Sequence, residues 1–134
     1  DAIASDHAPH AWEDKNREYD HAAFGISGIE TSVAVAIDTL YHGQEMPLLD
    51  IIKRYTTGPR AVLGITSEGV IPGARADFTI LDLNLVKRVD VEDFFSKGKN
   101  SPFQGKEFKG WPVMTICKGQ IIHEAGLNEV GQCT

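Results

Sequence analysis

The sequence has few cysteines, no long apolar run and no excess of positive charge. Only Cys117 and Cys133 occur in 134 residues, too few and too far apart for a disulfide framework or a thiolate zinc site. There is no run of about 18 apolar residues and no secretory pattern, so we expect a cytoplasmic protein without a membrane segment. The net charge of -6 argues against a nucleic-acid-binding surface.

The histidines are also informative by their spacing. The five histidines lack the paired spacing of zinc ligands, so we do not expect a complete zinc site within these residues. Hydrophobic residues make up 42% of the sequence, which supplies core material for one small domain.

The pentapeptide Asp6-His7-Ala8-Pro9-His10 is the most informative motif. The apolar run Ala2–Ser5 before it is typical of a short buried strand, and Pro9 ends that strand. Polar groups at the carboxyl end of a parallel strand are typical of α/β active sites. The alternative is a surface loop with a capping Asp and two solvated His, and the five residues alone do not decide between the two.

The first half of the chain has the pattern of helices. Ser27 and Glu30 form a predicted capping box for a helix that runs to Tyr41 and ends at Gly43. Pro47 precedes a second apolar helix face, and a third helical segment opens at Gly58-Pro59 and stops at Gly64.

The second half has the pattern of strands. We predict strands over residues 78–81, 113–117 and 120–123 and a weaker one over 86–91, with Lys118-Gly119 as a two-residue hairpin turn. The glycine-containing stretch 96–110 is predicted to be a long surface loop.

Three further stretches accompany the pentapeptide: Phe24–Thr31, Gly69–Asp77 and Ser96–Gly105. In this order and spacing they resemble the C-terminal portion of dihydroorotases, which are cyclic amidohydrolases of the amidohydrolase superfamily. The resemblance covers Asp1 to about Glu124. It implies that the chain is the last third of a zinc-dependent, homo-oligomeric enzyme, which interconverts dihydroorotate and N-carbamoyl-L-aspartate in pyrimidine (UMP) biosynthesis.

The resemblance also implies an α/β fold. Residues 1–65 would supply the last strand and helices of a (β/α)8 (TIM) barrel. Residues 66–134 would supply the C-terminal strands of a small β-sandwich and a tail. A single barrel strand cannot close a sheet, so these residues alone are expected to expose strand edges and helix faces.

Asp6 matches the family's aspartate that binds the metal and transfers a proton. Opening a cyclic amide needs hydroxide, which a divalent metal supplies by lowering the pKa of its bound water to roughly 7. A carboxylate beside it can accept the proton and return it to the departing nitrogen. The alternative for Asp6 is a cap or turn residue.

His10 matches the histidine that binds the substrate carboxylate in dihydroorotases. Dihydropyrimidinases, hydantoinases and allantoinases typically lack it, and their substrates lack that carboxylate. His10 therefore favours an acid-bearing substrate, with a surface histidine as the alternative. Phe24 and Gly25 match the substrate-contacting turn, although Ala23 stands where the family usually has Pro. We assign His7 to packing or supporting hydrogen bonds.

The remaining ligands that the family uses are not found in this sequence. Its His-x-His pair, bridging lysine or aspartate, two further metal histidines and substrate arginine all belong to earlier strands. We therefore expect one or two Zn²⁺ per full-length subunit, held mostly by residues outside this chain, and no activity from the chain alone. Two alternatives stay open: a non-catalytic dihydroorotase-like subunit that partners aspartate carbamoyltransferase, and a related cyclic amidohydrolase (allantoinase or dihydropyrimidinase).

Overall fold

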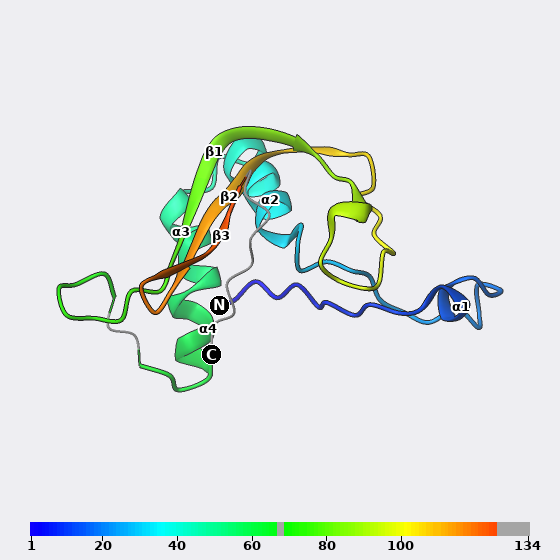
Figure 1. Ribbon diagram of the computed structural model, residues 1–134, viewed down its shortest axis with the longest axis horizontal. Coiled ribbons are helices and arrows are strands. Elements are labelled where there is room, and N and C mark those ends of the chain that lie inside the picture. The colour runs from blue at the N-terminus through cyan, green and yellow to red at the C-terminus, as the bar shows by residue number, and fades with distance from the viewer. Residues whose placement is uncertain (67–68, 126–134) are drawn as a thin grey trace.

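The computed structural model describes residues 1–66 and 69–125, which form a mixed α/β chain (Figure 1). Helices fill the first half, and a three-stranded antiparallel sheet of order β1-β2-β3 fills the second. The elements are α1 (Trp12–Lys15), α2 (Ser32–Ala36), the π-helical η1 (Ile37–Gly43), α3 (Leu48–Tyr55), α4 (Thr57–Val62), β1 (Phe78–Arg88), the 3-10 turn η2 (Val91–Asp93), β2 (Glu107–Cys117) and β3 (Gln120–Glu124). The predicted tail beyond residue 125 lies outside the described residues. None of the helices in the described ranges has the length and apolarity needed to cross a bilayer.

The helices end where the sequence predicts but do not all begin there. The α2–η1 unit ends at Gly43, and α4 ends just before Gly64. The capping-box prediction is wrong. The helix begins at Ser32, and the Ser27 hydroxyl donates to the Gly98 carbonyl instead of capping it. The Glu30 carboxylate accepts from the N–H groups of Phe95 and Ser96 at 2.7 and 3.0 Å, so both side chains bind a distant loop.

The sheet is more continuous than the sequence pattern indicates. The strand β1 contains the predicted strand over 78–81 and residues 86–88 of the weaker one, whereas Val91 lies in η2. Its pairing with β2 is irregular between Ile80 and Leu81 and between Asp82 and Val86. The predicted β2–β3 hairpin is confirmed, and Lys118 and Gly119 both have the positive φ angles, 50° and 79°, that a tight turn of this kind requires. The predicted loop over 96–110 is wrong at its end, because β2 already begins at Glu107, and Glu107, Phe108 and Lys109 pair with β1.

The two halves pack against each other through α2, η1 and β2. Gly110 lies against Ile37 so closely that an added Cβ would come within 2.2 Å of the Ile37 Cγ2 atom. The Lys109 N–H donates to the Asp38 carboxylate at 3.0 Å. The buried apolar core of the described residues is small: Ala34, Ala36, Ile37, Ile51 and Val89. Large apolar side chains such as Trp12 and Tyr19 remain exposed.

The predicted buried strand before the pentapeptide is not formed. Residues 1–6 have no regular secondary structure and run from the body of the molecule toward a projecting arm that carries α1 (Figure 1). One parallel bridge, between His7 and Ile26, is the only sheet-like pairing of this segment within residues 1–66 and 69–125. A parallel strand is stabilised by a ladder of several such bridges to each neighbouring strand. Here there is one bridge, which is too few to form a strand.

Asp77 stabilises the base of the β2–β3 hairpin in a pH-dependent way. Its carboxylate accepts from the Lys118 N–H at 2.7 Å and pairs with Arg75. The Lys118 hydrogen bond, with help from the Arg75 guanidinium, lowers the pKa of Asp77 below its ordinary value of 3.8. A carboxylate with a lowered pKa in the folded state stabilises that state above the unfolded pKa, and this stabilisation is lost as the pH falls through the folded pKa.

We therefore expect Asp77→Asn to lower the Tm near neutral pH, and this loss to shrink as the pH falls below 3.8. Thermal unfolding of both proteins between pH 7 and the acid limit measures it. Asn keeps an acceptor for the Lys118 N–H, so the comparison isolates the charge. A Tm difference that stays constant with pH would contradict the role of the charge.

Candidate functional site

The pentapeptide and the Phe24–Gly28 segment lie side by side. The Ala8 N–H donates to the Ile26 carbonyl at 2.9 Å, next to the His7–Ile26 bridge. The His7 Nδ1 atom accepts from the N–H groups of Gly28 and Ile29 at 3.2 and 3.3 Å. His7 therefore anchors the start of the following helical segment, in agreement with the supporting hydrogen bonds predicted for it.

Asp6 presents its carboxylate to solvent. The residue is exposed and makes no hydrogen bond or ion pair with any residue in 1–66 or 69–125. Its backbone has φ of 44°, in the left-handed region that costs most L-residues ~1–2 kcal/mol but that Asp and Asn tolerate best. Such backbone conformations are concentrated at functional sites.

The other three predicted site residues lie together. The His10 Nε2 atom is 2.6 Å from the Phe24 carbonyl oxygen. Gly25 has φ of 126°, and an added Cβ would lie 2.6 Å from the Ala8 Cβ, so no larger residue fits there. The Phe24 side chain is 86% exposed. The structure thus brings His10, Phe24 and Gly25 into contact and leaves Asp6 apart from their hydrogen bonds.

The loop that contains Gly98 and Asn100, from the second half of the chain, packs against this site. Gly98 packs on Pro9, where an added Cβ would lie 2.6 Å from the Pro9 Cβ. The Ser27 N–H donates to the Asn100 carbonyl at 2.8 Å, and the Asn100 side chain donates to the Gly25 carbonyl at 3.3 Å. Sequence reasoning did not assign Asn100 a role, although it lies in the Ser96–Gly105 stretch that carries part of the resemblance.

Lys15 is the second contributor that sequence reasoning missed. Its Nζ atom donates to the carbonyls of Ala23 and Gly25 at 2.7 and 3.1 Å. No pattern in the sequence distinguishes this lysine from the other residues of the polar stretch between His10 and Phe24.

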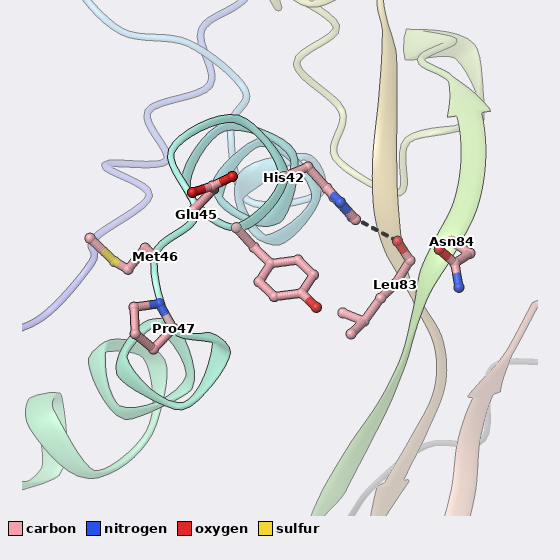
Figure 2. A pocket seen from close by; sticks show the side chains of 7 residues that line it. His42, Glu45, Met46, Pro47, Leu83 and Asn84 are labelled. Carbon is pink, nitrogen blue, oxygen red and sulfur yellow. Dashed lines mark hydrogen bonds between the residues drawn. The ribbon is translucent and has the colours of Figure 1, made fainter.

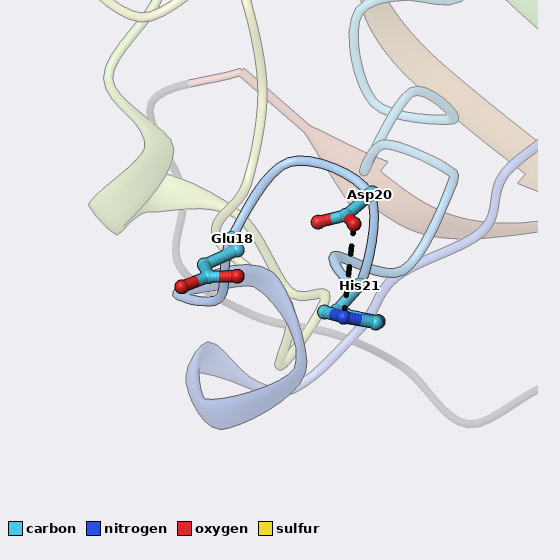
Figure 3. A group of neighbouring side chains, drawn as sticks. All are labelled: Glu18, Asp20 and His21. Atoms are coloured by element: carbon cyan, nitrogen blue, oxygen red, sulfur yellow. Dashed lines mark ion pairs between the residues drawn. The ribbon is translucent and has the colours of Figure 1, made fainter.

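The predicted site residues do not form a group of three or more metal-binding side chains within the described ranges. The one cluster of three metal-type side chains in the described ranges is Glu18, Asp20 and His21, whose donor atoms lie within 4.8 Å of one another on the exposed arm (Figure 3). Asp6 is not part of it. Its exposed, unpaired carboxylate has the chemistry of a single zinc ligand, which fits a site completed by other residues. The side chains of Glu18, Asp20 and His21 are all exposed, and no other observation indicates that they bind a ligand.

Two hollows lie outside the pentapeptide. An open cavity of about 470 Å³ lies between the η1–α3 connection and β1, and the His42 Nε2–H, at its edge, donates to the Leu83 carbonyl at 2.8 Å (Figure 2). None of the predicted site residues lines it. A second, mostly apolar hollow of about 370 Å³ lies beside the pentapeptide and is lined by residues that include Ile3, Ser5 and Ile26.

Sequence comparison identifies relatives over almost the whole chain. The model described as "Amidohydrolase family" matches residues 1–122. A curated protein named dihydroorotase from Pelotomaculum thermopropionicum is 43% identical over 91% of this chain and 29% of its own length. Another so named, from Anaplasma phagocytophilum, is 39% identical over 93% of this chain and 28% of its own length. The resemblance seen in the motifs is confirmed, and the chain spans less than a third of these relatives.

Solved structures agree with this result. The L-hydantoinase (dihydropyrimidinase) from Arthrobacter aurescens superposes with a TM-score of 0.89 at 31% identity, over 98% of this chain and 30% of that protein. The dihydropyrimidinase from Brevibacillus agri gives a TM-score of 0.81 at 17% identity, over 92% of this chain and 28% of that protein. At 17% identity, the similarity to the Brevibacillus agri protein indicates a shared fold and nothing about function.

Proposed function

This chain belongs to the amidohydrolase family, and from that premise we propose that it is a segment of a zinc-dependent dihydroorotase. The reaction is the reversible hydrolysis of (S)-dihydroorotate to N-carbamoyl-L-aspartate in pyrimidine biosynthesis. One observation carries the proposal: His10 lies 2.6 Å from the Phe24 carbonyl, beside Gly25. These are the three residues that the dihydroorotase resemblance assigns to the substrate.

Asp6 is the proposed catalytic residue and metal ligand. A zinc ion held there by Asp6 and by residues outside this chain would supply the Lewis acidity that makes hydroxide available at neutral pH. The Asp6 carboxylate takes the proton of the attacking water and returns it to the amide nitrogen as the ring opens. Its exposure and lack of any partner among the described residues leave both oxygens free for these tasks.

The substrate carboxylate is assigned to His10, and the ring to the turn at Phe24 and Gly25. The exposed Phe24 ring provides an apolar wall, and the absence of a Cβ at Gly25 lets the turn pack directly against Ala8 and His10. His10 and Phe24 are already in contact, so a carboxylate that binds His10 would lie next to the turn that contacts the ring.

The proposed full-length architecture is a (β/α)8 barrel with a small β-sandwich, and the boundary falls at residues 65/66. The three-stranded sheet would form part of that sandwich, and the exposed large apolar residues would face the rest of the protein or another subunit. We propose a cytoplasmic homo-oligomer. We also propose aspartate carbamoyltransferase as a partner protein of this homo-oligomer.

A hydantoinase or dihydropyrimidinase activity is the second candidate. The likeness in favour of it is the L-hydantoinase superposition, with a TM-score of 0.89 and 31% identity. His10 distinguishes the two candidates, because a neutral cyclic amide offers no carboxylate for an imidazole to bind.

The test is a set of assays on the full-length protein supplied with zinc. We expect turnover of dihydroorotate in both directions, loss of turnover after chelation and recovery when zinc returns. The 134-residue chain alone should be inactive under the same conditions. Faster hydrolysis of hydantoin or dihydrouracil than of dihydroorotate would reject the dihydroorotase assignment and support the second candidate.

A further inference from the structure

The turn proposed to contact the substrate, Ala23–Gly25, has three consecutive carbonyls, and each of them is hydrogen-bonded to a side chain. Lys15 donates to the carbonyls of Ala23 and Gly25, His10 contacts the carbonyl of Phe24, and Asn100 also donates to that of Gly25. These donors come from α1, from the pentapeptide and from the loop after η2. Main-chain carbonyls in a surface turn usually bind water, so side-chain donors on three in a row hold this turn in one conformation.

Lys15 contributes the larger part of this support. It holds the carbonyls on both sides of Phe24 at 2.7 and 3.1 Å, whereas Asn100 holds one at 3.3 Å. Lys15 is half-buried and forms no salt bridge with a carboxylate in residues 1–66 or 69–125. Hydrogen bonds from a charged donor are the stronger kind, and a half-buried cation without them would be poorly solvated. The Ala23 N–H also donates to the Asp14 carbonyl at 3.0 Å, which fixes the turn to the residue before Lys15.

The hydrogen bonds to these carbonyls also fix the direction of the main-chain N–H groups in the turn. In a trans peptide the N–H is directed opposite to the carbonyl, and the structure contains no cis peptide among its described residues. The N–H groups of Phe24 and Gly25 have no hydrogen-bond partner within 1–66 and 69–125, although the carbonyls on the same peptides, those of Ala23 and Phe24, are held. The turn therefore offers main-chain donors whose direction is set by Lys15 and His10.

We infer that Lys15 is a positioning residue for substrate binding: it fixes the Ala23–Gly25 turn so that the turn meets the substrate in one orientation. Lys15 itself does not touch the reacting atoms. This inference rests on the proposed function for the identity of the substrate, but its geometric part does not. Loss of the cation should loosen the turn and weaken binding, and leave the proton transfers at Asp6 in place.

The experiment compares Lys15→Met, Lys15→Arg and Lys53→Met in the full-length protein. Lys53→Met is the matched control, because the exposed Lys53 lies on α3 and its ammonium group, among the described residues, pairs with the Asp50 carboxylate alone, at 3.4 Å. We expect Lys15→Met to raise the KM for dihydroorotate about tenfold, equivalent to ~1.4 kcal/mol, with kcat changed by less than about twofold. Lys15→Arg keeps a cationic donor and should recover most of the affinity.

A second readout is amide hydrogen exchange over residues 19–27, measured by mass spectrometry without substrate. Exchange there should quicken in Lys15→Met and not in Lys53→Met. An unchanged KM together with unchanged exchange in Lys15→Met would overturn the inference, as would a fall in kcat and Tm without a rise in KM. If the wild-type protein does not turn over dihydroorotate, the proposed function fails, and the exchange measurement still decides whether Lys15 holds the turn.

Discussion

Asp6→Asn in the full-length protein should reduce the turnover of dihydroorotate by ~10²–10⁴-fold or more, the usual cost of losing a positioned acid–base group. An amide can neither accept the proton of the attacking water nor return it to the nitrogen. The fold should be unaffected for two reasons. The Asp6 side chain is exposed, and Asn tolerates the φ of 44° at this position as well as Asp does.

The matched control for Asp6→Asn is Asp20→Asn. Asp20 is an exposed carboxylate on the α1 arm whose only ion pair in the described ranges is with His21, at 3.7 Å. Both variants remove one surface charge, so any general effect of charge on activity appears in each. Steady-state kinetics and zinc content per subunit, measured on both, separate slowed chemistry from a lost metal ligand. Retention of more than about a tenth of the wild-type rate in Asp6→Asn would remove Asp6 from the catalytic role.

Local patterns in the sequence predicted those features of the fold that depend on local chemistry. A glycine after an apolar helical face predicted the end of η1 at Gly43, and the Lys118-Gly119 pair predicted the β2–β3 hairpin. Both are decided by the backbone preferences of one or two residues. The predicted strands over 78–81, 113–117 and 120–123 all fall within strands of the sheet, because alternation and β-branched residues mark them, although β1 and β2 are longer than predicted.

Contacts between distant segments were not predictable in this way. Ser27 and Glu30 have the spacing of a capping box, yet they bind Gly98 and the N–H groups of Phe95 and Ser96, about 65 to 71 residues further along the chain. A hydroxyl or carboxylate satisfies a loop N–H as well as a helical one, and only the three-dimensional structure decides which. Asn100 and Lys15 were missed for the same reason, since carbonyl acceptors leave no mark on the sequence.

The site residues were predicted through the motifs and then found close together. His10 and Phe24 are fourteen positions apart in the sequence, and their 2.6 Å contact was not predicted by the spacing alone. That contact also adds a competing explanation for His10. A neutral imidazole has one N–H, so when Nε2 donates to the Phe24 carbonyl, Nδ1 has no proton to donate to a substrate carboxylate. His10 either gives up the Phe24 carbonyl on binding, is protonated on both nitrogens, or serves to hold the turn.

His10→Ala tests these alternatives through the choice of substrate. If His10 binds the carboxylate, its loss should weaken the interaction with dihydroorotate by ~2–5 kcal/mol, the usual cost of truncating one partner of a hydrogen-bonded charged pair. Dihydrouracil has the same ring without the carboxylate, so its kcat/KM should fall only by the smaller factor that a loosened turn costs. If His10 only holds the Phe24 carbonyl, both substrates should lose the same factor, because the turn that contacts the ring is common to them. Kinetics with both substrates on wild type and His10→Ala measure the difference, and Lys15→Met on the same two substrates shows what a loosened turn alone costs.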